Sequence, residues 1–259
     1  GELLACGFTN GTIKIMGGST LLELASFRHS RSCITHVAFS ASSEYFASAC
    51  ADRAVAVYRR LRLDELEAAD PVDGSAVAAA ARAGWELVGR QRAHAHDVVD
   101  LTFGGADGEP PRLFSVGSDR RVVEYDLERS SVADGLQLRA SAAVEHSAKP
   151  TACFWLGDEE QLVVANDAHK LRPVAVHHDR IETVQKVLGP TYSGPVVSFA
   201  PVAGTAGGDG PQYVAYATSD KVIGLLQLPL DGNPNRGMGL IAHPGEVSAL
   251  AATHDGRYL

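Results

Sequence analysis

The chain has 259 residues, with 31 Asp and Glu against 23 Lys and Arg and a formal net charge of −8 at pH 7. This acidic balance argues against a general nucleic-acid-binding protein, which would need a basic face for the phosphate backbone. No stretch approaches the ~18 uncharged apolar residues of a membrane span, and the first residues do not resemble a signal peptide. The four cysteines lack CxxC spacing, so we expect buried thiols in a reducing compartment rather than disulfides or a zinc site.

Three short strands are predicted near the start of the chain, at Leu3–Phe8, Thr12–Met16 and Thr20–Leu24. A unit that recurs about every fifty residues follows them. The full unit has a His, an apolar strand that ends in an aromatic residue, a second strand and an acidic turn, and the copy that contains Phe199 lacks the His. Alternating apolar residues bury one face of each strand. Self-similarity at this period predicts one supersecondary unit copied along an array.

The repeat can be followed through its histidines and its turn residues. The histidines are His29, His94, His146 and His243, and the turn residues are Asp52, Asp119, Asp167 and Asp220. A strand hydroxyl precedes the first two turns, at Ser48 and Ser115. We expect the His, the hydroxyl and the turn Asp to hydrogen-bond within one sheet, because buried polar groups need partners. The repeated residues are therefore interpreted as structural, and no catalytic residue is assigned.

Six residues after the turn Asp, Tyr58 and Tyr125 keep an aromatic side chain, and Tyr125-Asp126 is the nearest match to a Trp-Asp motif. The order and spacing of these motifs resemble the WD-repeat β-propeller family, whose four-stranded blades run about 40 to 45 residues. The resemblance implies an all-β propeller array over residues 1–259. About five blade equivalents are expected, cut in mid-blade at both ends and forming part of a seven-bladed propeller. A last inner strand is expected at 247–250.

The longest departure from the repeat is an insertion at 61–84, within the second blade. It carries Asp64, Glu65, Glu67 and Asp70 in a helix-prone segment. This insertion and those at 104–111, 201–211 and 229–236 join first to second or third to fourth strands, so we expect all of them at one face. Two interpretations remain open. The 61–84 segment is either a tolerated solvent loop or an acidic arm on which a partner protein docks.

Two segments contain the residue types of ligand sites but lack their full patterns. Asp231–Asn235 starts like a calcium loop, but Arg236 replaces the turn Gly and Ala242 replaces the bidentate Glu. The Gly-rich segment 203–210 has neither the Lys nor the strand-to-helix context of a phosphate loop. No GxSxG motif is present. We therefore predict no metal, no cofactor and no small-molecule substrate, and we expect that the chain is not an enzyme.

A closer resemblance involves Ala217–Pro234 and Gly239–Pro244, which are similar to cilia- and flagella-associated WD-repeat proteins of the calmodulin- and spoke-associated complex. It implies a non-catalytic scaffold of the cytoplasm and cytoskeleton, in the axoneme of a cilium or flagellum. Its partners would be radial-spoke-base and calmodulin-associated subunits near doublet microtubules, and it would influence motility. That family has a calcium-binding tail, which has no counterpart in these residues.

Fold by itself does not determine function, so other classes stay open. The chain could be a generic WD-repeat adaptor of another intracellular complex, such as a ubiquitin ligase or a trafficking complex. Some propellers are hydrolases, but no paired carboxylates or nucleophile arrangement is found here.

Overall fold

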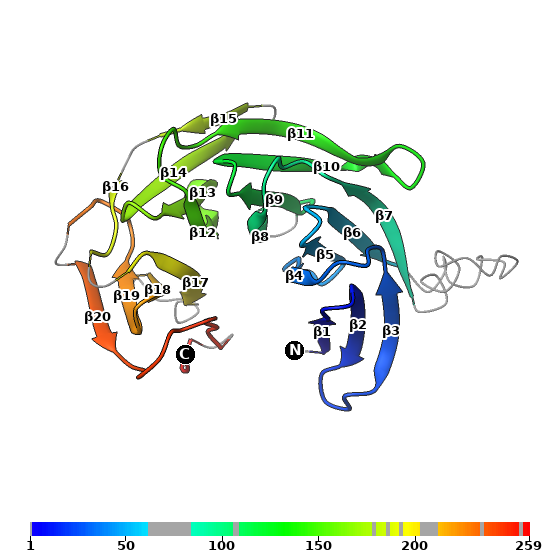
Figure 1. Cartoon of the computed structure of the whole chain (residues 1–259), viewed down its shortest axis with the longest axis horizontal. Coiled ribbons are helices and arrows are strands. Elements are labelled where there is room, and N and C mark those ends of the chain that lie inside the picture. Colours follow the sequence, from blue (N-terminus) through cyan, green and yellow to red (C-terminus); the bar gives the residue numbers. More distant parts are fainter. Residues whose placement is uncertain are drawn as a thin grey trace, which may run out of the picture. The chain divides into compact units, whose positions relative to one another are not determined.

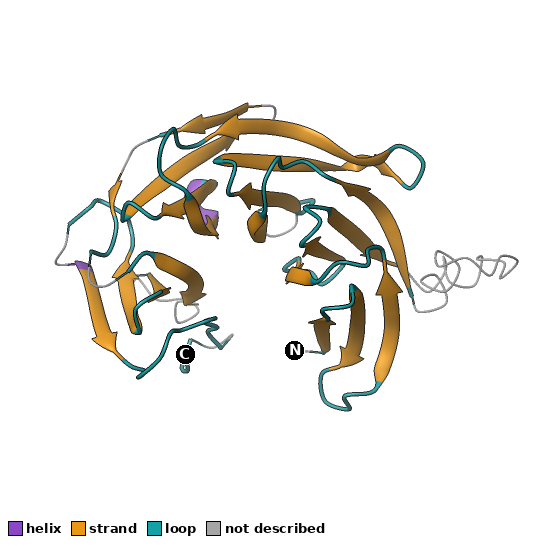
Figure 2. Cartoon of the chain, viewed as in Figure 1, coloured by secondary structure: helices purple, strands orange, loops and turns teal. Residues whose placement is uncertain are grey.

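The computed structural model describes residues 2–61, 84–105, 109–177, 180–184, 187–191, 194–202, 212–233, 236–253 and 256–259. Within these ranges the regular structure is β-strand apart from the 3₁₀ turn Gly157–Glu159 and a 3₁₀ residue at Arg236 (Figure 2). The all-β class predicted from the repeat is confirmed.

The chain divides into two compact units, each with its own sheets. The first unit contains Gly1–Asp119 and Val123–Ser141, and the second contains Arg120–Val122 and Ala142–Leu259. In every sheet, strands that are consecutive in sequence lie side by side, except that the last strand of one sheet, at 187–188, pairs with the strand two before it (Figure 1). Local pairing of this kind needs only short turns between neighbouring strands.

The first unit holds a three-stranded sheet, a four-stranded sheet and most of a second four-stranded sheet, whose residues 121–122 and 142–143 fall in the second unit. The three-stranded sheet consists of β1 (Leu3–Gly7), β2 (Thr12–Gly17) and β3 (Glu23–Arg28). The next sheet consists of β4 (Ile34–Phe39), β5 (Tyr45–Cys50), β6 (Val55–Arg60) and β7 (Trp85–Gln91). The third consists of β8 (Val98–Gly104), β9 (Arg112–Gly117), β10 (Arg121–Ser131) and β11 (Gly135–Ala143).

The second unit holds two sheets of the same design. One consists of β12 (Pro150–Leu156), β13 (Gln161–Asn166), β14 (Lys170–His177), β15 (Arg180–Thr183) and β16 (Val187–Leu188). Strands β15 and β16 both pair with β14, at different points along it, and together they fill the fourth position. The other sheet consists of β17 (Val196–Val202), β18 (Tyr213–Thr218), β19 (Val222–Gln227) and β20 (Gly237–Ile241).

The second strand of each four-stranded sheet is buried on both faces. In β5, Phe46 and Cys50 belong to the core shared with β1–β3, whereas Ala47 and Ala49 belong to the core shared with β8–β11. The period of two along a strand sends alternate residues to opposite faces. A strand whose sheet lies between two others therefore has a continuous run of apolar residues. Each large side chain buried in this way contributes about 1.5 to 3 kcal/mol to stability.

The second unit has an equivalent core between its two sheets. Phe154 of β12 and Phe199 of β17 lie with ring centroids 4.8 Å apart, and buried Tyr216 of β18 belongs to the same cluster. These first and second strands therefore pack sheet against sheet, as the alternating pattern predicted.

Two strand predictions were wrong. The third strand was expected at Thr20–Leu24, but β3 begins at Glu23, because Leu21 takes a left-handed turn (φ 55°) and the buried alternation is supplied by Ala25 and Phe27. The inner strand expected at 247–250 is not formed. No described strand pairs with those residues, and a strand needs a hydrogen-bonded neighbour to satisfy its backbone.

Candidate functional site

The predicted repeat residues lie at one edge of each four-stranded sheet, where the turn between the second and third strands occurs. We call this the aspartate edge, after the turn residues Asp52, Asp119, Asp167 and Asp220. The residue after three of these aspartates is left-handed, with φ of 68° at Arg53, 67° at Arg120 and 80° at Lys221. Such conformations are uncommon for non-glycine residues, so the same unusual turn geometry recurs in three of the sheets.

At the β8–β11 sheet, the structure brings the three predicted side chains together. Nε2 of His94 lies 2.8 Å from Oγ of Ser115, and Nδ1 lies 3.0 Å from Oδ1 of Asp119. The other carboxylate oxygen accepts the backbone N–H of Ala95 at 2.9 Å. The hydroxyl of Tyr125 lies 2.8 Å from the same serine Oγ. Polar groups from the connection, β9, the turn and β10 therefore form one continuous network.

A Ser–His–Asp chain is also the arrangement that activates serine nucleophiles in hydrolases. Here Ser115 and the His94 side chain are both fully buried, and the serine Oγ lies within hydrogen-bonding distance of Tyr125 as well. Burial raises the pKa of the tyrosine hydroxyl, which keeps it protonated. A substrate carbonyl cannot approach an oxygen that is enclosed in this way, so the arrangement supports a structural role.

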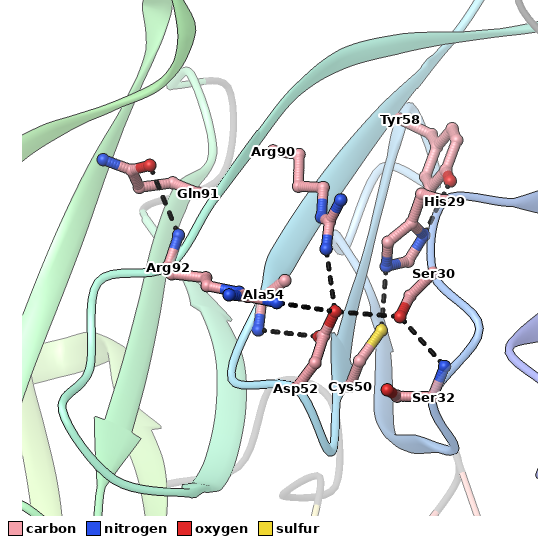
Figure 3. Close-up of polar contacts among 10 residues, drawn as sticks. All are labelled: His29, Ser30, Ser32, Cys50, Asp52, Ala54, Tyr58, Arg90, Gln91 and Arg92. Carbon is pink, nitrogen blue, oxygen red and sulfur yellow. Dashed lines mark hydrogen bonds and ion pairs between the residues drawn. The ribbon is translucent and has the colours of Figure 1, made fainter.

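The β4–β7 sheet departs from the predicted pattern. We expected His29 to bond to Ser48 and Asp52, but its Nε2 lies 2.9 Å from Sγ of Cys50 and its Nδ1 lies 3.0 Å from the Tyr58 hydroxyl (Figure 3). The hydroxyl of Ser48 is fully buried and has no hydrogen-bond partner among the described residues. That prediction was wrong.

The reason is a difference in spacing. His29 precedes its turn aspartate by two residues fewer than His94 precedes Asp119, so its ring reaches two residues further along the strand. Burial, followed by the nearby charge of Arg90, lowers the pKa of His29 to about 4, against a smaller opposing effect of Asp52. Burial and then Asp52 raise the pKa of Cys50 to about 11. The contact thus joins a neutral imidazole to a neutral thiol at physiological pH.

Asp52 is held by a different set of partners, which the sequence did not reveal. Its Oδ2 accepts hydrogen bonds from Ser30 at 2.9 Å, Arg90 at 2.8 Å and Arg92 at 3.4 Å, and its Oδ1 accepts from the Ala54 N–H (Figure 3). Burial alone would raise the pKa of Asp52, but the hydrogen bonds from Ser30 and Ala54 and the charge of Arg90 outweigh it and lower that pKa. The sequence signal that could have indicated these partners is a pair of arginines, Arg90 and Arg92, two residues apart at the end of the fourth strand.

At the β12–β16 sheet, the buried hydrogen bonds are made by Glu145 and not by the predicted His146. The His146 side chain is exposed, and Glu145 is buried instead. Glu145 accepts two hydrogen bonds from Arg172, at 2.9 and 3.1 Å, and one from the side-chain amide of Asn166 at 3.0 Å. Asp167 accepts from the backbone N–H of Lys149 at 2.9 Å. The structural role predicted for His146 was therefore wrong, and a Glu–Arg pair fills its place.

The two remaining repeat positions are exposed. The side chains of Asp220 and His243 lie at the surface, and neither joins a buried network in the described part of the second unit. The proposed docking residues Asp64, Glu65, Glu67 and Asp70 lie outside the described residues. Strands β6 and β7 flank their insertion, which places it between a third and a fourth strand, at the edge opposite the aspartate edge.

The left-handed arginines also contact the backbone of the following connection. Arg53 donates from Nη1 to the carbonyl of Ala95, and Arg120 donates from Nη1 to the carbonyl of His146 at 3.0 Å. These contacts were not predicted, although the Asp-Arg dipeptide repeats at 52–53 and 119–120 and could have indicated them.

Within the described ranges, no three His, Cys, Asp or Glu side chains gather as metal ligands would. In the same ranges, no helix is long and apolar enough to cross a membrane.

Comparison with known proteins fits this geometry. The family model "WD domain, G-beta repeat" matches residues 22–59, which contain β3 to β6. A chain in the crystal structure of a mitotic checkpoint complex superimposes with a TM-score of 0.68 over 99% of this chain and 67% of that chain, at 16% identity. The chain therefore contains a WD repeat and has the sheets of a WD-repeat β-propeller fold. At that identity the structural likeness shows the fold alone.

The chain is also similar over its length to proteins named cilia- and flagella-associated protein 251. The relative from Pongo abelii is 32% identical over 100% of this chain and 21% of its own length, and that from Mus musculus is 32% identical over 100% and 19%. The relative from Tetrahymena thermophila is 31% identical over 67% of this chain and 20% of its own length. The chain therefore spans about a fifth of these relatives.

Proposed function

We propose that this WD-repeat chain is a non-catalytic protein-interaction scaffold of the axoneme of a cilium or flagellum. In this proposal it helps to anchor radial spokes and regulatory complexes to doublet microtubules and so influences motility. The observation that carries the proposal is the similarity, over the whole chain, to relatives whose names associate them with cilia and flagella.

The packing of the described residues supports scaffolding rather than chemistry. The Ser–His–Asp chain is enclosed, and the buried carboxylate Glu145 is neutralised by an arginine within its own sheet. Side chains that are used in this way hold strands and turns in fixed positions, and loops on a rigid frame are well suited to binding other proteins.

The acidic insertion at 61–84 is proposed as one docking element for neighbouring subunits. A net-acidic chain is a poor electrostatic match for an acidic microtubule surface, so subunits of the assembly should make most of its contacts. Deleting 63–83 should leave the propeller folded, because changing loop length costs little, and should weaken assembly. Unchanged co-purification of spoke-base subunits would exclude this segment as a docking element.

The proposal is tested by the location of the intact protein in a ciliated cell. A tagged endogenous copy should follow the axoneme through detergent extraction, and its loss should reduce radial-spoke-base subunits in isolated axonemes. A protein found only in the cell body, with axonemes of unchanged composition, would contradict the proposal and favour an adaptor of another complex.

A further inference from the structure

Arginines gather at the aspartate edge of the first unit, although the chain as a whole carries a net charge of −8. We define the arginine surface as Arg31, Arg53, Arg90 and Arg92. Arg31 lies between β3 and β4, Arg53 in the turn between β5 and β6, and the other two at the end of β7 and just after it. Each of these three segments therefore contributes at least one arginine to the surface.

Two of these arginines bind one carboxylate, and the other two are sequence neighbours of that carboxylate or of its Ser30 partner. Arg90 and Arg92 both reach the same oxygen of Asp52, at 2.8 and 3.4 Å (Figure 3). Arg53 is the next residue along the turn. Arg31 lies between Ser30, which donates to that oxygen at 2.9 Å, and Ser32, whose N–H donates to the Ser30 hydroxyl at 3.0 Å.

The positive charge of this surface is not balanced within these segments. Asp52 has one negative charge, which already faces two guanidinium groups. The side chains of Arg92 and Arg53 are 62% and 48% exposed, and the contact of Arg53 with Asp97 is 3.9 Å long. Arg31 is also exposed. An exposed guanidinium group has five N–H donors, so these side chains have donors left for further carboxylates.

We propose that the arginine surface binds an acidic polypeptide segment, rich in Glu or Asp, of a partner protein. Guanidinium groups form paired hydrogen bonds with carboxylates, and several of them around a fixed turn provide a preorganised site. A nucleic acid fits less well, because a long phosphate backbone would also meet the field of a net-acidic chain. The inference goes beyond the proposed function and does not depend on which assembly contains the protein.

The test measures binding of a fluorescein-labelled peptide of about eight glutamates to the purified intact protein, by anisotropy at low salt. Its glutamine counterpart serves as the neutral probe. We expect binding of the glutamate peptide only, and Arg31→Glu combined with Arg92→Glu should weaken it about tenfold or more. Arg129→Glu combined with Arg180→Glu is the matched control. It also reverses two charges, at side chains of β10 and β15 that are 85% and 77% exposed and outside the arginine surface, and it should alter affinity by less than about twofold.

The proposal is overturned by equal binding of the two peptides, by an unchanged affinity of the double variant, or by an equal loss in the control variant Arg129→Glu with Arg180→Glu. A phosphoserine peptide of the same length is run in parallel. Binding of that peptide alone would overturn the carboxylate proposal in favour of phosphate recognition. If the double glutamate variant does not fold, Arg31→Gln with Arg92→Gln removes the same charges, and the same criteria apply with a loss of about fivefold.

Discussion

His94 and Asp119 are 25 residues apart in sequence and lie 3.0 Å apart at Nδ1 and Oδ1, inside one blade. The pair joins the connection before β8 to the turn after β9. Asp119→Ala should lower the free energy of unfolding by about 1 to 3 kcal/mol, because it leaves the buried imidazole and the Ala95 N–H without an acceptor. Urea unfolding at neutral pH measures this loss.

The control for this change is Asp97→Ala, an aspartate at the same edge whose side chain is 80% exposed. Its loss should change the free energy of unfolding by less than about 0.5 kcal/mol. Equal effects of the two substitutions would contradict a special role for the His94 network.

Ser48 and Ser115 both lie four residues before a turn aspartate, but only the second lies within hydrogen-bonding distance of a partner. Ser115→Ala should cost about 1 to 2 kcal/mol, because it removes the central oxygen of a buried network. Ser48→Ala should be neutral or should stabilise the protein by up to about 1 kcal/mol, since it removes a buried hydroxyl without a partner. Thermal unfolding of the two variants decides between these expectations. A large loss in Ser48→Ala would show that this hydroxyl has a partner after all.

Glu145 and Arg172 form a largely buried ion pair with two hydrogen bonds. Arg172→Met should destabilise the protein by about 3 kcal/mol, because it leaves a buried carboxylate without its cation. Arg180→Met is the matched control, since the Arg180–Glu182 pair is exposed and should contribute less than about 0.5 kcal/mol. Chemical denaturation measures both, and similar losses would show that burial does not set the strength of these pairs.

His29 should make stability depend on pH. Its pKa is lowered, chiefly by burial, from an ordinary 6.5 to about 4. The unfolded chain therefore binds more protons between these values, so stability falls as pH falls from 6.5 towards 4. His29→Gln should remove about 2 kcal/mol of this dependence, measured by urea unfolding at pH 7.5, 6, 5 and about 4.5.

Two other groups bear on that measurement. Burial also lowers the pKa of His36, so part of the pH dependence should remain in the variant. The lowered pKa of Asp52 acts below its ordinary 3.8, outside the window. His96→Gln, at an exposed histidine, is the control. A His29 variant with the same slope as this control would refute the expectation.

Periodicity determined the fold class and the positions of most strands. The alternating apolar residues, such as Phe46 and Cys50 on one face and Ala47 and Ala49 on the other, depend only on the period of two along a strand. The His94 network was also predictable, because one blade is a local unit and its residues keep the spacing of the repeat.

At the other sheets, tertiary structure alone decided which polar groups meet at the aspartate edge. A two-residue difference in spacing moves the His29 ring from Ser48 to Cys50, and Glu145 replaces the neighbouring His146. Arg90 and Arg92 reach Asp52 from a strand that follows it after the 61–84 insertion. Sequence spacing gives the face of a strand, but hydrogen-bond partners depend on distances of a few tenths of an ångström between separate segments, and only the folded packing fixes those.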